Sequence, residues 1–204
     1  MTSRRSFINF RVAVSVLLLS SLAVFLYCSR ETLDAFGMAD DDDTTLLSKL
    51  VVSVRQTERS PLTFALKVTN TGSDPVTILT WESPLDGLAL QLGLLSITPS
   101  GAPSPLDLPT IQVRRKTPPD EDQLVTLDTG ESREREIVIK EPVVPISDLA
   151  GDNKGKGTIK CRGRWMSVWP VKRDGVTDKA LELQGLGDEA LTGQFESDSV
   201  EFEV

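Results

Sequence analysis

Apolar and polar side chains alternate with a period of two along much of this 204-residue chain. The pattern is clearest in Leu62–Thr69, Ile159–Met166 and Val200–Val204, where every second residue is apolar or small. A period of two is typical of a β-strand buried on one face, because successive side chains point to opposite sides of a sheet. Seven to nine short stretches of this kind, with turn signals about every ten residues, predict an all-β fold, an antiparallel β-sandwich.

Turns rich in Gly, Pro, Asn and Asp separate the alternating stretches. We expect strands at 50–54, 62–69, 76–81, 88–98, 111–116, 124–127, 132–139, 159–166 and 200–204. Gly93 predicts a bulge in the leucine-rich strand at 88–98, and the valines between Pro142 and Pro145 predict an edge or a crossover. A single helix is expected at Thr177–Leu186, with Thr177 as N-cap and Gly187 as its C-terminal stop.

The N-terminal region differs in composition from the remainder. The 18 residues Val12–Ser29 carry no charge, and as a helix rising about 1.5 Å per residue they would just span a hydrocarbon core. Arginines precede this stretch and the acidic run Asp40–Asp43 follows it, which places the N-terminus in the cytosol. We therefore expect a signal-anchor or transmembrane segment at 1–37, an acidic linker at 38–45 and a β-sandwich domain at 46–204.

Three interpretations of the hydrophobic segment remain open. An uncleaved anchor would hold the domain on the lumenal or extracellular side of a membrane, whereas cleavage after Ala23 would release a secreted protein. Translation from Met38 would instead give a cytoplasmic domain, which agrees with the lack of an N-x-[ST] sequon. Of the first two, the anchor is favoured because the bulky residues Val24–Tyr27 extend the apolar run.

The composition excludes several kinds of chemistry. Without a histidine, the chain cannot build a Ser-His-Asp or Cys-His nucleophile system or an imidazole-ligated zinc site. Two cysteines are too few for a disulfide framework or a four-cysteine metal site. Residues 38–204 carry 18 basic and 28 acidic side chains, a balance that disfavours nucleic acid as a partner. We expect no enzyme activity, no cofactor, no metal and no small-molecule substrate.

Basic side chains provide the candidate surface for a partner. Three of them alternate along the strand at 159–166 and share the parity opposite its apolar residues, so they should point to solvent. The alternative is a charge ladder in which these cations pair with Glu201 and Glu203 on the closing strand. The full candidate set adds two cations from 111–116 and the tryptophan before Pro170: Arg114, Lys116, Lys160, Arg162, Arg164 and Trp169.

Other groups of residues have structural interpretations that we favour. Cys161 lies on the apolar face of its strand, which predicts a buried and unreactive thiol. The three tryptophans could form a ligand-stacking platform, but core packing is favoured, with Trp169 partly exposed. The run Asp40–Asp43 lacks the ligand spacing of a calcium loop. The loop carboxylates at 120–122 are expected at the surface rather than as a catalytic pair.

One resemblance to a known family begins at Leu66–Ser73, a strand that ends in Asn-Thr-Gly. Together with Pro84-Leu85-Asp86 and the turn at 125–132, this segment resembles the immunoglobulin-like N-terminal prosegment of the fungal deuterolysin-type zinc proteases. The similarity would cover residues 46–145, and the protease domain that should follow is missing. The whole chain also resembles uncharacterised fungal proteins with Ser-Pro-Leu-Asp and Gly-Arg-Trp-Met segments, here Ser83–Asp86 and Gly163–Met166. The resemblance implies an immunoglobulin-like sandwich.

These features predict a non-catalytic module that binds an unidentified protein partner through its loops or an exposed sheet edge. The segment Val12–Ser29 would tether it to a membrane or direct it through one. The resemblance to a protease prosegment implies an alternative function, a stand-alone chaperone or inhibitor of a partner protease.

Overall fold

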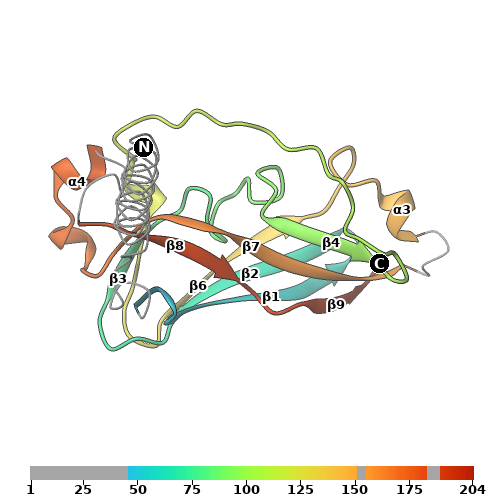
Figure 1. The fold of residues 1–204 in the computed structure, drawn as a ribbon, viewed down its shortest axis with the longest axis horizontal. Coiled ribbons are helices and arrows are strands. Elements are labelled where there is room, and N and C mark those ends of the chain that lie inside the picture. The colour runs from blue at the N-terminus through green and yellow to red at the C-terminus, as the bar shows by residue number, and fades with distance from the viewer. Residues whose placement is uncertain (1–45, 151–154, 183–188) are drawn as a thin grey trace, which may run out of the picture. The chain divides into compact units, whose positions relative to one another are not determined.

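Two antiparallel sheets make up the fold (Figure 1), and the computed structural model describes residues 46–150, 155–182 and 189–204. Every strand pair is antiparallel. This arrangement confirms the predicted all-β, immunoglobulin-like sandwich. The first sheet has the order β1 (Leu50–Arg59), β2 (Leu62–Asn70) and β6 (Ser132–Val138). The second contains β4 (Leu95–Pro99), β7 (Lys156–Trp169), β3 (Val76–Leu79) and β5 (Leu124–Leu127), and β8 (Leu191–Glu196) and β9 (Val200–Glu203) also pair with β7.

The core between the sheets consists of the alternating residues that the sequence indicates. On β2 the inward side chains are Leu62, Phe64, Leu66 and Val68, and all four are buried. Each such side chain contributes about 1.5–3 kcal/mol when it is removed from water. The same cluster includes the inward side chains of β7, among them Ile159, Cys161 and Trp165.

The helical segments are short. η1 (Glu121–Gln123) precedes β5, α3 (Ile146–Ala150) precedes β7, and η2 (Arg173–Gly175) and α4 (Asp178–Glu182) follow β7. The N-cap prediction for α4 is confirmed, because the Ala180 amide donates to Thr177 Oγ1 at 3.1 Å. The predicted stop at Gly187 lies outside the described residues. A second, smaller cluster of buried side chains joins the end of β3 to α4 and its preceding residues: Leu79, Trp81, Trp169, Val176, Ala180 and Leu181.

Two strand predictions are wrong in detail, and one strand was missed. Residues 88–94 form successive turns rather than a strand, with Leu92 donating to the Leu88 carbonyl and Gly93 at a φ of +78°. These turns bury Ala89, Leu90 and Leu94. The buried positions have the spacing of a helical turn, whereas leucines at every even position had indicated a strand. The segment 111–116 has no ladder partner among the described residues. Pro142–Pro145 lies in the connection from β6 in the first sheet to β7 in the second, which agrees with the predicted crossover, whereas α3 and β8 were not predicted.

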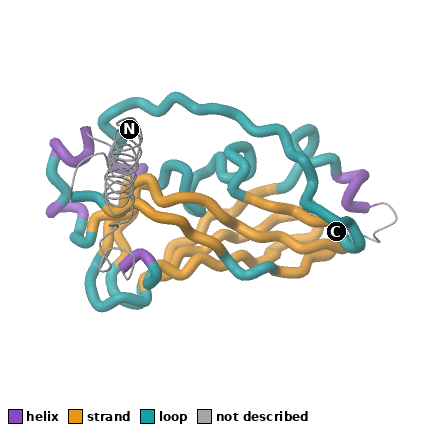
Figure 2. The backbone as a smooth tube through the Cα atoms, in the orientation of Figure 1, coloured by secondary structure: helices purple, strands orange, loops and turns teal. Residues whose placement is uncertain are grey.

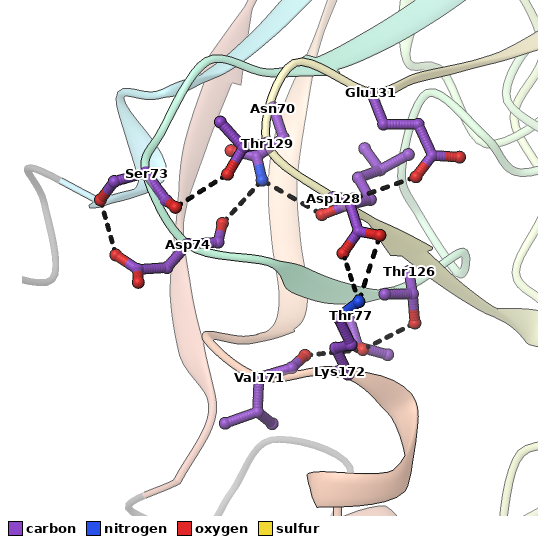
Figure 3. Close-up of polar contacts among 11 residues, drawn as sticks. Asn70, Ser73, Asp74, Thr77, Thr126, Asp128, Thr129, Glu131, Val171 and Lys172 are labelled. Carbon is purple, nitrogen blue, oxygen red and sulfur yellow. Dashed lines mark hydrogen bonds and ion pairs between the residues drawn. The ribbon is translucent and has the colours of Figure 1, made fainter.

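The Asn-Thr-Gly motif has a structural role at one end of the sandwich. Here β2 crosses to β3 in the second sheet, and β5 returns to β6 in the first. The buried Asn70 amide donates to the carbonyls of Asp74 (2.8 Å) and Leu127 (3.1 Å) and accepts from Gly72 (2.9 Å), which joins both crossings (Figure 3). The motif that carries the prosegment resemblance therefore encodes a feature of the fold.

Candidate interaction surface

The cations of β7 point to solvent, as predicted, but two of the three have partners on β8. The Lys160 ammonium forms an ion pair with the Glu196 carboxylate. Arg164 donates to Thr192 Oγ1 at 3.0 Å. Arg162 stands opposite Glu196 in the register and is exposed. Arg162 and Arg164 also line an open groove of about 580 Å³ together with Gly93, Leu94, Gly163, Gln194, Phe195 and Glu196.

The charge ladder therefore exists, although its partners differ from those expected. The closing strand β9 does pair antiparallel with β7, but Glu201 faces Thr158. Glu203 accepts instead from Lys156 (2.9 Å) and Arg59 (2.8 Å). The unpredicted strand β8 pairs with the later half of β7, so Glu196 is the carboxylate that reaches Lys160.

The Lys160–Glu196 pair predicts a specific response to acid. The hydrogen bond and charge of Lys160 hold the pKa of the Glu196 carboxyl below its ordinary value of 4.5. A lowered folded-state pKa stabilises the fold above the unfolded-state pKa, and this contribution is lost as the pH falls through the folded-state value. In a Glu196→Gln variant, the thermal midpoint measured between about pH 3 and pH 6 should fall less on acidification than in the parent. Identical pH profiles for the two proteins would contradict the pairing.

Trp169 does not belong to an exposed surface, and the prediction of its partial exposure is wrong. Only 2% of the residue is exposed. A bulge gives β7 one more residue than β8 between the pairs Trp165–Gly193 and Val168–Leu191. The extra residue reverses the parity of the strand. Val168 consequently joins the main core, and Trp169 packs in the second cluster beside Trp81.

The remaining two candidates lie in a long connection between β4 and β5 (Figure 2), whose part Pro105–Lys116 we call the outer segment. It runs without a turn or bend. The Leu106 amide donates to the Ile97 carbonyl at 2.8 Å and the Ile111 amide donates to the Gln91 carbonyl at 3.0 Å. The outer segment therefore runs antiparallel to the chain from Gln91 to Ile97, which comprises the turns before β4 and the first half of β4. On its other side β4 pairs with β7. In the described part of the chain it makes no further backbone hydrogen bonds.

Arg115 holds the C-terminal end of the outer segment. Its guanidinium lies 2.5 Å from a carboxylate oxygen of Asp86, which is 4% exposed, and 5.9 Å from the ring centre of Trp81. The same carboxylate accepts from the amides of Glu82 and Leu88, both at 2.9 Å. Because Ile111 is held at one end and Arg115 at the other, residues 112–114 are suspended between two fixed points.

The suspended residues are exposed on both faces. Ile111 and Val113 are 48% and 36% exposed, and Gln112 and Arg114 are also exposed. Within the described residues Arg114 has no ion pair, while Lys116 lies 3.7 Å from Asp120. Of the six sequence-predicted site residues, the structure thus places four on β7 and two on the outer segment, and one of the four, Trp169, is buried.

An exposed, unpaired segment with basic residues should be the first target of trypsin within the described residues. Proteases bind substrates as extended chains, and cleavage concentrates where the backbone is exposed and has few hydrogen bonds. We expect the first cut after Arg114 or Lys116, with the two pieces held together by the β2–β6 and β4–β7 pairings. Mass spectrometry and size-exclusion chromatography of a brief digest test this, and a first cut within β7 would contradict it.

The thiol of Cys161 is buried at 0% exposure, as predicted, and burial raises its pKa to about 12. Because the thiolate is the reactive form, a bulky maleimide should modify Cys161 at least about a hundredfold more slowly in native buffer than in denaturant. Peptide mapping after timed labelling separates Cys161 from Cys28. Equal rates in the two solvents would show that the thiol is accessible in the folded domain.

The described carboxylates do not form a metal site. No group of three or more His, Cys, Asp or Glu side chains is placed to hold a metal ion in the part of the chain that the structure covers. Asp120 and Asp122 lie exposed around η1. The run Asp40–Asp43 lies outside the described residues.

Residues 49–204 match the immunoglobulin-like domain family, and the chain therefore belongs to that family. It is also 35% identical over 144 residues to an uncharacterized secreted protein of Arthroderma benhamiae (strain ATCC MYA-4681 / CBS 112371), a match that covers 69% of this chain and 68% of that protein. Neither match bears on the deuterolysin prosegments, so that resemblance stays a hypothesis.

The structure describes no helix that is long and apolar enough to cross a membrane. The predicted membrane segment Val12–Ser29 lies outside the described residues.

Proposed function

We propose that this chain is a secreted, non-catalytic immunoglobulin-like module that binds a protein partner through the outer segment. The observation that carries the proposal is the suspended stretch 112–114, which is extended, exposed and free of backbone partners among the described residues. Unpaired extended backbone is a template for pairing with another chain. The sequence pattern of 111–116 has the β-propensity that such pairing needs.

The burial of Cys161 and the lack of histidine favour a binding role over thiol-based catalysis. Acyl or group transfer would need an activated nucleophile beside a base. Cys161 is buried with a raised pKa, and the chain has no histidine to act as its base. The β7 cations Lys160 and Arg164 already have partners on β8, which leaves the outer segment as the better candidate for contact.

The secreted location is supported by the relative, whose printed name is uncharacterized secreted protein. N-terminal peptide mapping of endogenous protein from a fungal culture and its medium tests this part of the proposal. We expect the extracellular form to begin after residue 23, consistent with removal of a leader. A protein that begins at Met38 and stays in the cytosol would contradict secretion, and an intact N-terminus in the membrane fraction would indicate an anchor instead.

Site-specific photocrosslinking tests the interaction surface. A benzophenone side chain at Gln112 lies on the outer segment, and one at Glu136 on the exposed strand β6 serves as the control. In a fungal culture that secretes the chain, we expect a discrete adduct from position 112 that disappears with excess unmodified protein. Adducts of equal yield at both positions, or none at position 112, would contradict the proposal.

A further inference from the structure

We infer that the partner presents an extended, acidic peptide segment, which adds as a strand to the open edge of the outer segment. This inference rests on the proposed function and specifies the chemistry of the partner at the same surface. Three features of the outer segment lead to it: the direction of its free backbone groups, its local charge and its fixed ends.

The direction of the backbone groups follows from one hydrogen bond. In an extended chain the N–H and C=O of one residue point to one edge, and those of the next residue point to the opposite edge. The Ile111 amide points towards the domain, since it donates to the Gln91 carbonyl at 3.0 Å. Strict alternation from Ile111 to Arg114 would turn the amides and carbonyls of Gln112 and Arg114 away from the domain, where a partner strand can pair with them.

The charge of the outer segment indicates which charge the partner peptide should carry. Arg114, Arg115 and Lys116 are consecutive cations in a chain whose net charge is −8. Asp86 neutralises Arg115 and Asp120 lies beside Lys116, but Arg114 has no ion pair within the described residues. An acidic side chain opposite Arg114 would supply that pair. The exposed Ile111 and Val113 lie on the alternate parity, so the best partner alternates acidic and apolar residues.

The fixed ends reduce the cost of binding. A loop that must become ordered on binding loses conformational entropy of about 1–2 kcal/mol per residue. Residues 112–114 are already extended between Ile111 and Arg115, which are held by Gln91 and Asp86. A peptide can thus pair with them without first ordering the segment.

Three synthetic heptapeptides serve as probes for the full-length chain. The first alternates glutamate and valine, the second lysine and valine, and the third glutamate and glycine. We expect saturable binding of the Glu-Val peptide, weaker binding of the Glu-Gly peptide because glycine has low β-propensity, and no binding of the Lys-Val peptide. Amide shifts in NMR spectra should be largest at Gln112 and Arg114.

Two matched pairs of variants separate charge from strand addition. Arg114→Glu should weaken Glu-Val binding by about tenfold, whereas Arg162→Glu, the same change at another exposed arginine without an ion pair among the described residues, should leave it within about twofold. Gln112→Pro removes an outward amide and should weaken binding by about tenfold. Val113→Pro removes an inward amide and should have little effect. Thermal melting of each variant checks that it folds.

The outcomes distinguish this inference from the proposed function. Equal binding of the Glu-Val and Lys-Val peptides, or no binding at about 1 mM, would overturn the acidic-strand inference. If position 112 still crosslinks specifically, the interaction module stands and its partner has other chemistry. Equal effects of the two proline substitutions would also overturn strand addition, because only one of the two amides faces outward.

Discussion

Replacement of Asp86 by alanine is expected to lower the free energy of unfolding by about 3 kcal/mol, because it breaks a largely buried ion pair and leaves its other groups unpaired. The carboxylate accepts from the Glu82 and Leu88 amides and from Arg115. One of these amides belongs to Glu82, whose positive φ of 52° is unfavourable for a residue with a side chain. Urea denaturation of the parent and the variant measures the loss.

Arg115→Met is the matched control for this prediction. It removes the ion pair but keeps both backbone amides bound to the carboxylate, so it should cost less, about 1–2 kcal/mol. Both variants should be cleaved faster by trypsin in the outer segment, because each releases its C-terminal end. A loss below about 1 kcal/mol for Asp86→Ala, or unchanged cleavage in both variants, would show that this contact does not hold the segment.

The parts of the fold that follow from alternation could be predicted from the sequence. On β2, Leu62, Phe64, Leu66 and Val68 occupy one face, and β1 and β6 pair with it on either side. Burial of one face fixes the register, since a shift by one residue would expose the whole apolar set. The burial of Cys161 followed from the same parity on β7.

The parts that failed depend on events that interrupt the alternation. A single bulge in β7 turned Trp169 away from the main core, and the later residues Val176, Ala180 and Leu181 cover it there. No residue at 166–167 marks a bulge in the sequence. The strand β8 contains Gly193 at an inward position, where the Leu47 side chain leaves little room for a Cβ. That glycine weakened a pattern otherwise visible in Leu191 and Phe195.

At the candidate site, too, features that depend on the local sequence pattern could be predicted, and features that depend on tertiary contacts could not. Arg114 and Lys116 were identified from charge, but the strand predicted at 111–116 is a segment without turn or bend that has no ladder partner among the described residues. Its lack of a ladder could not be predicted, because it depends on how the preceding turns at 88–94 place Gln91 and on the contact between Arg115 and Asp86. Asp86 itself gave no signal beyond its place in the Ser-Pro-Leu-Asp turn.

Replacement of Asn70 by alanine is the second large effect that we expect, a loss of about 3 kcal/mol in the free energy of unfolding. The side chain is buried and uses both amide protons and its carbonyl oxygen. Alanine would leave the Leu127 carbonyl and the Gly72 amide without these partners at the point where both crossings meet. The nearby Thr129→Val change removes one exposed hydrogen bond, to the Ser73 carbonyl, and should cost under about 1 kcal/mol.

An aspartate at position 70 separates hydrogen bonding from shape, because it has nearly the size of asparagine. Its carboxylate would still accept from Gly72 but would face the carbonyl oxygens of Asp74 and Leu127 with no proton to donate. We therefore expect Asn70→Asp to be less stable than Asn70→Ala near pH 7 and to regain stability in acid, where a protonated carboxyl can donate. Urea denaturation at both pH values measures this order. If both variants fold as stably as the parent, Asn-Thr-Gly is not needed for the crossing, and its likeness to the protease prosegments would then require a functional explanation.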